Sequence, residues 1–296
     1  MPVRSNKLSR ERECEIVELA EMHADEACPS GAVDPLAIFS NEEVPVIFGS
    51  YGEGTFDGML EFKAGKFAAF CNIDRGNEKG TARARFTLAH ELGHLLIPEH
   101  RLALMNGTAA HSSRCGMFDG AEDDEEFEAD LFASNLLMPA RRFELAAKKL
   151  VSATPIKAAL SLKEQFKTSI LSTAIRYGEH RTEVVALIYW KDEQISWRRI
   201  QDAFFYQHQF RKWKLDKVSQ LPPDCATAAA LAGSHSSLEV HDSVLSANFC
   251  FERVAMGGHR DLILREEALR LGSHGVLTVL SVHPKFPTTT PQSVTW

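Results

Sequence analysis

The sequence predicts an α+β fold, because helical and strand-like patterns occupy different parts of the chain. Up to about residue 182, most apolar residues recur at the three- and four-residue spacing of amphipathic helices, apart from strand-like runs between 44 and 73. Beyond that point, short runs rich in valine, isoleucine and aromatic residues become frequent. With 296 residues, 44% of them hydrophobic, the chain can fill one large domain or two smaller ones.

The first elements are predicted to be two helices and a small antiparallel sheet. A helix is expected over 8–27, and Asp34 followed by Pro35 has the pattern of an N-cap and the first residue of a short helix. The sheet is predicted from the runs 44–48, 59–62 and 67–73. Pro45 marks the first run as an edge strand, and Ala64-Gly65 joins the other two runs as a hairpin.

Two longer helices are predicted next. The segment TARARFTLAHELGHLLI, residues 81–97, has apolar residues at helical spacing until Pro98 ends the pattern. Residues 101–122 contain several glycines and serines and are expected to be irregular. An acidic start then opens a second helix over 123–138, which Pro139 ends.

The predicted organisation is a first domain over 1–155, a helical linker over 156–182, an α+β domain over 183–283 and a tail over 284–296. Strands of the later domain are expected at 184–190, 247–255 and 275–282. The tail is rich in threonine and proline and is expected to be extended or disordered.

Composition and charge set limits on the class of protein. The formal charge of −7 argues against a dedicated nucleic-acid coat or a membrane-surface protein. No run approaches the ~18 uncharged apolar residues that span a bilayer, and the N-terminus has no apolar signal segment, so a cytoplasmic location is expected. The six cysteines are scattered without a CxxC pair, which predicts mostly reduced and buried thiols.

The most informative motif is HELGH, which begins at His90 in the predicted 81–97 helix. Residues four apart lie on one face of a helix, so His90 and His94 can bind one zinc ion. Glu91 projects toward the same cleft and is predicted to be the general base that takes a proton from water acidified by the metal. A five-residue match arises easily by chance, but its position after a sheet and before a second helix is what a zincin-like fold requires.

Two residues compete to be the third protein ligand that a catalytic zinc needs. His100 lies six residues after His94, the metzincin spacing, but Ile97 stands where that turn requires glycine. Glu126 and Asp130 share a face of the second helix, so one can bind zinc while the other accepts the free N–H of a ligand histidine. Taken alone, this acidic segment would fit a solvated helix start favoured by the helix dipole.

Together the segments RARFTLAHELGHLL and EFEADLFASNLLMP resemble the ImmA/IrrE family of metallopeptidases, over about residues 10–185. The resemblance implies a gluzincin-type zinc site in which His90, His94 and Glu126 are ligands, Glu91 is the base and Asp130 supports a ligand histidine. It also implies a protein substrate, because family members act on helix-turn-helix repressors or antitoxins and so derepress stress, phage or mobile-element genes.

The resemblance extends to the regions that follow. Residues 162–180, LKEQFKTSILSTAIRYGEH, resemble the family's helix-turn-helix-like extension, although the segment is not notably basic and is a poor candidate for reading DNA. A GAF-like sensor fold is implied for 183–283, where no cofactor motif is evident.

A loop cysteine between the two predicted ligand helices suggests a latch. The segment RCGMFD around Cys115 resembles the cysteine switch of matrix metalloproteinases, although Ser113 and Phe118 replace prolines of that pattern. A thiolate in the open coordination position would exclude water from the metal. We therefore interpret Cys115 either as a zinc ligand of a reversible latent state or as a loop cysteine without a role.

One aromatic and basic segment suggests an activating ligand. FFYQHQFRKWK, residues 204–214, interleaves aromatic rings with cations such as Arg211 and Lys212, a composition that binds single-stranded nucleic acid. Trp213 is the candidate stacking residue. The alternative is an amphipathic core element with a solvated basic edge.

The sequence thus predicts a zinc-dependent regulatory endopeptidase that cleaves a repressor or antitoxin, is held latent by Cys115 and is activated by a ligand such as single-stranded DNA. A non-catalytic regulator, which keeps the zincin fold as a scaffold for binding protein or DNA, is the rival from another class. The rival would bind metal without turnover, or bind none.

Overall fold

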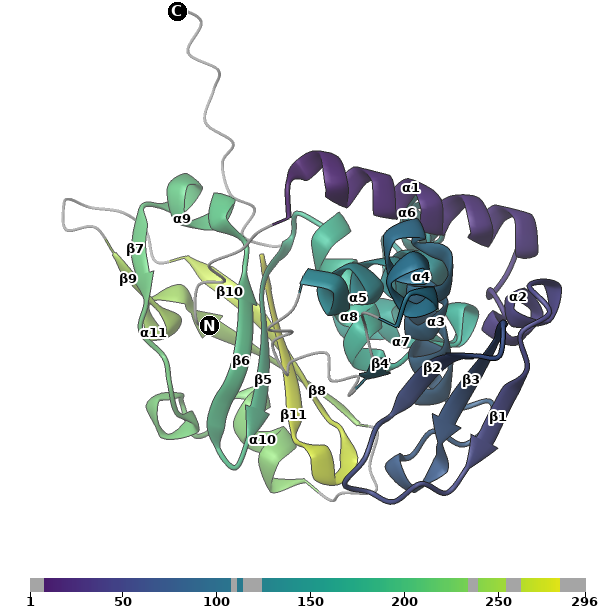
Figure 1. Ribbon diagram of the computed structural model, residues 1–296. Coiled ribbons are helices and arrows are strands. Elements are labelled where there is room, and N and C mark those ends of the chain that lie inside the picture. Colours follow the sequence, from purple (N-terminus) through teal and green to yellow (C-terminus); the bar gives the residue numbers. More distant parts are fainter. Residues whose placement is uncertain (1–7, 108–110, 114–123, 234–238, 254–261, 283–296) are drawn as a thin grey trace, which may run out of the picture. The chain divides into compact units, whose positions relative to one another are not determined.

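The computed structural model describes residues 8–107, 111–113, 124–233, 239–253 and 262–282 (Figure 1). The chain divides into two compact units, and each is described by itself. The N-terminal unit comprises residues 2–150 and 160–173, and the C-terminal unit comprises 151–159 and 174–296. Both helices and strands occur in the described residues, which confirms the predicted α+β class.

Six helices that lie wholly in the N-terminal unit are described. They are α1 (Arg10–Ala27), α2 (Pro35–Asn41), α3 (Ala82–Leu96), α4 (Pro98–Met105), α5 (Asp124–Leu137) and α6 (Ala140–Lys148), with a short 3-10 helix η1 (Ile73–Arg75). Side-chain N-caps begin several of these helices, and the one at Asp34 was predicted. Asp34 accepts a hydrogen bond from the backbone of Leu36 at the start of α2, and Thr81 accepts one from Ala84 at the start of α3.

A four-stranded sheet accompanies these helices, with strand order β1-β3-β2-β4. Its strands are β1 (Val46–Gly49), β2 (Gly58–Lys63), β3 (Lys66–Asn72) and β4 (His111–Ser113). The β2–β3 hairpin is confirmed, and its two turn residues, Ala64 and Gly65, both have positive φ, as the tightest hairpin turns require.

The prediction that this sheet is antiparallel was wrong for its first strand. β1 is an edge strand, as Pro45 indicated, but it pairs in parallel with β3. The reason lies in the loop between Gly49 and Gly58, which is long enough to carry the chain past β3 before β2 begins. β3 thus lies between β1 and β2, parallel to β1 and antiparallel to β2.

A helix occupies part of the region that was expected to be irregular. Pro98 ends α3 as predicted, yet it is also the first residue of α4, which runs to Met105. Proline lacks the N–H that an α-helix interior needs, but its fixed φ suits the first helical position, where no such bond is made. The chain therefore turns at Ile97 and continues directly as a new helix.

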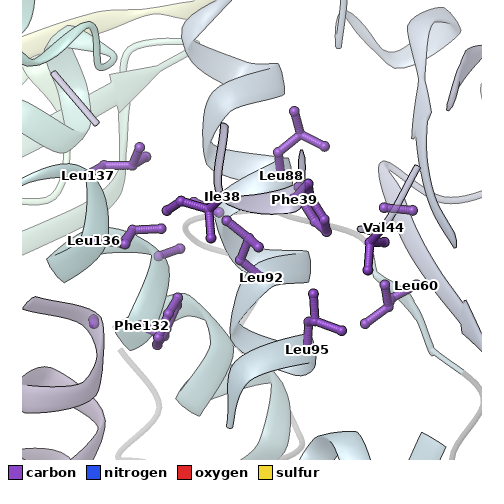
Figure 2. Packing of buried hydrophobic residues seen from close by; sticks show 14 of the residues in the cluster. Ile38, Phe39, Val44, Leu60, Leu88, Leu92, Leu95, Phe132, Leu136 and Leu137 are labelled. Atoms are coloured by element: carbon purple, nitrogen blue, oxygen red, sulfur yellow. The ribbon is translucent and has the colours of Figure 1, made fainter. Parts of the chain in front are cut away.

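The hydrophobic core of the N-terminal unit lies around α3 (Figure 2). Leu88, Leu92 and Leu95 lie on the buried side of this helix. Their neighbours in the cluster come from α2, from β2 and from α5, and include Ile38, Phe39, Leu60, Phe132 and Leu136. Because one helix carries both this apolar side and the HELGH motif, the packing of the core positions the motif.

Two helices connect the domains expected from the sequence, α7 (Pro155–Phe166) and α8 (Ile170–His180). Each of them is divided between the two compact units. In the C-terminal unit, Glu267 accepts hydrogen bonds from the Thr154 hydroxyl and from the backbone N–H of Ile156, which is 3.2 Å away. These bonds tie the first turn of α7 to a strand of that unit's sheet.

The C-terminal unit contains a five-stranded antiparallel sheet with order β6-β5-β11-β10-β8. Its strands are β5 (Val184–Lys191), β6 (Gln194–Ile200), β8 (Val240–Ser246), β10 (Ile263–Arg270) and β11 (Val276–Val282). A separate pair is formed by β7 (Phe210–Trp213) and β9 (Phe251–Arg253). The remaining elements are α9 (Asp202–His208), η2 (Val218–Gln220), α10 (Ala226–Ala232), α11 (Ala247–Cys250) and η3 (Gly272–His274).

The predicted strands at 184–190 and 275–282 are confirmed, but the one at 247–255 was wrong in its first half. Ser246 accepts a hydrogen bond from the backbone of Asn248 and so caps a helical turn, α11, before β9 begins. The strand β10 was not anticipated, because it contains Glu266 and Glu267, both buried. The carboxylate of Glu266 is satisfied there by Thr227 and Ser243.

Within the described ranges, no helix is long and apolar enough to cross a membrane. The tail at 284–296, predicted to be extended or disordered, lies outside the residues that the structure describes.

A buried carboxylate holds the start of β2 in place. Asp57, fully buried, accepts hydrogen bonds from Arg75 at 3.0 Å, from Arg83 at 2.7 Å and from Asn77 at 3.1 Å. Burial alone would raise the pKa of Asp57, but the hydrogen bonds from both arginines and the charge of Arg83 lower it below its ordinary value. Thr87 of α3 donates to Asn77, so the network joins the sheet to the motif helix.

Asp57→Asn is expected to lower the free energy of unfolding by about 1.5–3 kcal/mol at neutral pH, the usual range for a hydrogen-bonded charge. Since folding lowers the pKa of Asp57, its contribution is complete above the unfolded pKa and is lost as the pH falls through the folded pKa. Denaturant unfolding over a pH series should therefore show the gap between variant and wild type closing in acid. The exposed Glu78→Gln is the control, and a gap independent of pH would contradict this account.

Candidate metal centre

Two histidines of the motif face each other on the buried part of α3. His90 and His94 are one turn apart and almost fully buried, and their Nε2 atoms are 3.0 Å apart. The rings meet edge to face, with centroids 4.8 Å apart. Both imidazoles therefore direct the same nitrogen toward one point, as two ligands of a single ion would.

The carboxylate of Glu126, near the start of α5, completes the group. One of its oxygens is 3.3 Å from Nε2 of His90 and the other is 3.4 Å from Nε2 of His94. One ligand atom from each of the three residues lies within 4.8 Å of the other two. The structure thus brings together the three residues that the sequence analysis selected.

The close approach of α3 and α5 depends on two small residues. A Cβ atom added at Gly93 would lie 3.0 Å from the Cα and 3.2 Å from the Cβ of Ala129, closer than side chains normally pack. Glycine inside a helix costs about 1 kcal/mol relative to alanine, so its presence in α3 requires a packing reason. Gly93 and Ala129 allow the helix backbones to lie near enough for Glu126 to reach both histidines.

The donor set fits a divalent metal ion. Ligand atoms bound at about 2.0–2.1 Å in a tetrahedral site are about 3.3 Å from one another. The two Nε2 atoms are 3.0 Å apart, and each of them is 3.3 or 3.4 Å from a different oxygen of Glu126, so small side-chain movements suffice to bind one ion. Two neutral imidazoles and one carboxylate form the His₂Glu set of catalytic zinc sites. The side chain of Glu126 is 30% exposed, so the group is accessible on the side of that residue.

Asp130 contacts the outer ring nitrogen of His90. Its Oδ1 is 2.9 Å from Nδ1 of His90, the ring nitrogen that faces away from the metal group. A carboxylate in this place fixes the tautomer and the orientation of a ligand imidazole. Asp130 lies one helical turn after Glu126, so a single face of α5 carries both the carboxylate of the three-residue group and the carboxylate that contacts His90.

His100, the other candidate for the third ligand, lies on the opposite side of His94 from the metal group. Its Nδ1 is 3.1 Å from Nδ1 of His94, and its Nε2 is 3.0 Å from Oε2 of Glu128. Arg12 of α1 donates to both oxygens of Glu128, at 2.9 and 2.8 Å. The sequence analysis assigned no role to Glu128 or Arg12, since no spacing rule connects residues 116 positions apart.

Glu91, the predicted base, is fully buried and packs against strand β2. A Cβ added at Gly58 would lie 2.4 Å from Oε1 of Glu91 and 2.6 Å from the methyl group of Thr87. Only glycine therefore leaves room for the carboxylate beside this strand. Gly58 directly follows Asp57, so the buried Asp57 network also holds the strand position that borders Glu91.

The remaining sequence candidates are Cys115, Arg211, Lys212 and Trp213. Cys115 is outside the described residues. Arg211 and Lys212 are exposed on β7, 4.0 and 3.1 Å from oxygens of Glu252. Trp213 is partly buried, with its ring edge-on to that of Phe251.

The aromatic rings that precede these residues divide between core and surface. Phe204 and Phe210 belong to the hydrophobic core of the C-terminal unit, whereas Tyr206 is 85% exposed. The segment thus combines a buried aromatic side with an exposed edge that carries the cations and one tyrosine.

In the N-terminal unit, two histidines of an HExxH helix meet a glutamate of a second helix, an arrangement of the kind found in HExxH metallopeptidases. Residues 76–177 match the model of the peptidase M78 family, described as the IrrE N-terminal-like domain. The predicted resemblance to the ImmA/IrrE family is thereby confirmed for the segment that carries both metal-binding motifs.

Other comparisons concern the whole chain. A Mycobacterium tuberculosis transcriptional regulator of known structure aligns over 91% of this chain and 77% of its own, with a TM-score of 0.54 and 15% identity. At this identity the likeness shows a shared fold alone. No curated protein matches.

Gly93→Ala tests whether the spacing of the two helices controls the site. The added methyl group should push α5 away from α3 and weaken binding of a divalent metal by about tenfold or more, the effect expected when ligands lose their orientation. Competition with a chromophoric chelator measures this affinity. Gly93→Ala combined with Ala129→Gly should recover part of the loss; unchanged affinity in the single variant would show that the close contact is unimportant.

Proposed function

We propose that this protein is a zinc-dependent regulatory endopeptidase. The observation that carries the proposal is the convergence of His90, His94 and Glu126 on the helix pair that also carries Glu91. The two Nε2 atoms are 3.0 Å apart, and each is 3.3 or 3.4 Å from one of the two Glu126 oxygens. These residue types at these distances suit zinc bound by three protein ligands with one position left open. The match of residues 76–177 to a peptidase family supports the same activity.

The chemistry proposed for the site assigns one role to the metal and the others to the chain. When bound, zinc supplies a Lewis acid that polarises the scissile carbonyl and lowers the pKa of water. Glu91 takes the proton from the attacking water and then passes it to the departing amine. The contact with Gly58 restricts where the Glu91 carboxylate can lie, and Asp130 keeps His90 in the tautomer that presents Nε2.

The proposed substrate is a helix-turn-helix repressor or antitoxin. This choice follows from the ImmA/IrrE resemblance, because members of that family act on such proteins. The structural likeness to a protein titled a transcriptional regulator is compatible with a role in gene control. Cleavage would derepress stress or defence genes.

Glu91→Gln separates a peptidase from the rival scaffold function. The change should reduce cleavage, by roughly 10²–10⁴-fold, of a candidate helix-turn-helix repressor that the wild-type protein cleaves, because it removes proton transfer. Zinc content should stay near that of wild type, since Glu91 is not a ligand. The exposed Glu61→Gln on β2 is the control. Full zinc occupancy without any wild-type cleavage would favour the scaffold, and cleavage unaffected by Glu91→Gln would exclude the assigned base.

A GAF-like sensor role is proposed for the C-terminal unit. Numbered within that sheet, its strands have the order 2-1-5-4-3, which is compatible with a GAF-like fold. The proposed signal is single-stranded DNA bound along β7, where Arg211 and Lys212 are exposed and where Tyr206 of the neighbouring α9 is available for stacking. The proposed response is release of Cys115 from the open zinc position.

Two separate variants test the latch and its proposed activator. Cys115→Ser tests the latch, and the double variant Arg211→Gln/Lys212→Gln tests the activation by single-stranded DNA. Cys115→Ser should raise basal cleavage roughly severalfold, because a serine hydroxyl is a poorer zinc ligand than a thiolate. The double Gln variant should keep its basal cleavage but should not be stimulated by a single-stranded oligonucleotide. The wild-type protein should bind that oligonucleotide, and its affinity should fall as the salt concentration rises. The exposed Cys14→Ser is the control. Unchanged basal activity in Cys115→Ser would eliminate the latch, and absence of oligonucleotide binding would eliminate this activator.

A further inference from the structure

A continuous chain of polar contacts leads from the metal group to helix α1. It begins at His94 on α3, passes through His100 on α4 and Glu128 on α5, and ends at Arg12 on α1. The three successive contacts measure 3.1, 3.0 and 2.8 Å. We call these four residues the His94 relay.

The relay is enclosed by protein over most of its length. His94 is fully buried, His100 is 2% exposed and Glu128 is 7% exposed. A carboxylate at such a depth is costly unless it is paired. Arg12 pairs with it through a fork, with Nε on one oxygen and Nη2 on the other, the geometry in which arginine binds carboxylates most specifically.

When a metal is bound, the geometry determines which nitrogen donates in each hydrogen bond of the relay. A metal held on Nε2 of His94 leaves the proton on Nδ1, so this nitrogen must donate. Nδ1 of His100 then accepts, and its own proton lies on Nε2, which donates to Glu128. Every donor in this arrangement meets an acceptor, and Glu128 receives hydrogen bonds from both His100 and Arg12.

The turn at Ile97 and Pro98 explains why His100 lies where it does. Because Pro98 starts α4 immediately after α3 ends, His100 falls in the first turn of the new helix and returns toward His94. The same turn places Nε2 of His100 toward α5 and away from the metal group. His100 is thus placed to support a ligand and not to be one.

We propose that His100, Glu128 and Arg12 are positioning residues of the metal centre, which fix the tautomer and ring orientation of His94. The proposal rests on the metal-binding function proposed above. In this arrangement, the two ligand histidines are held in different ways. His90 is held directly by Asp130, a partly exposed carboxylate, whereas His94 is held by a carboxylate through an intervening buried imidazole.

The test compares the zinc affinity of purified full-length variants by chelator competition, with the absorption spectrum of the cobalt-substituted protein as a report on ligand geometry. His100→Phe should weaken zinc binding by about 10–100-fold, the range found when the support of a ligand histidine is removed. His100→Asn should lose less, because its carbonyl oxygen can accept the proton of His94 although it cannot reach Glu128. Leu104→Val, a conservative change at another buried position of α4, is the matched control and should bind zinc like wild type.

Each result separates this inference from the function on which it rests. Wild-type affinity and an unaltered cobalt spectrum in His100→Phe, while His90→Ala abolishes binding, would overturn the relay and leave the metal centre intact. Failure of the wild type to bind zinc would overturn both. If His100→Phe does not fold, Glu128→Gln is measured instead. This change keeps an oxygen that can accept from His100 but removes the charge with which Arg12 pairs. An unchanged zinc affinity in Glu128→Gln would also overturn the relay.

Discussion

The contact between α3 and α5 is the constraint on which the site depends. Gly93 and Ala129 let two helix backbones approach more closely than larger side chains would permit, and Glu126 reaches the histidine pair because of this approach. The hydrophobic core around Leu92 and Phe132 holds the two helices together on the other side (Figure 2). The packing of the core and the convergence of the three candidate ligands therefore both depend on this helix pair.

The surroundings of the group are as specific as the ligands themselves. His90 is supported by Asp130, His94 by the His94 relay, and Glu91 is confined by the glycine at the start of β2. These supports come from elements far apart in the sequence, from α1 to α5. An HExxH helix can arise by chance, whereas a set of oriented neighbours around it is much less expected without a function.

Local patterns predicted α1, α2, α3 and α5, the hairpin and the motif residues, because each depends on neighbours a few positions away. HELGH and the acidic face that contains Glu126 and Asp130 follow the helical period, so both were recognisable. The pairing of Arg12 with Glu128 was not, since it depends on how α1 and α5 pack. The strand β10 was missed for a related reason: its buried Glu266 is satisfied by groups from α10 and β8, and a sequence pattern alone presents it as a surface residue.

We expect His90, His94 and Glu126 to hold a zinc ion and His100 to stay outside the coordination sphere. Crystallography of the zinc-loaded protein, with anomalous diffraction collected at the zinc absorption edge, tests this most directly. We expect one strong anomalous-difference peak at about 2.0–2.1 Å from Nε2 of His90, from Nε2 of His94 and from a carboxylate oxygen of Glu126. A peak coordinated by His100, or no peak at this group in a crystal that holds zinc elsewhere, would contradict it.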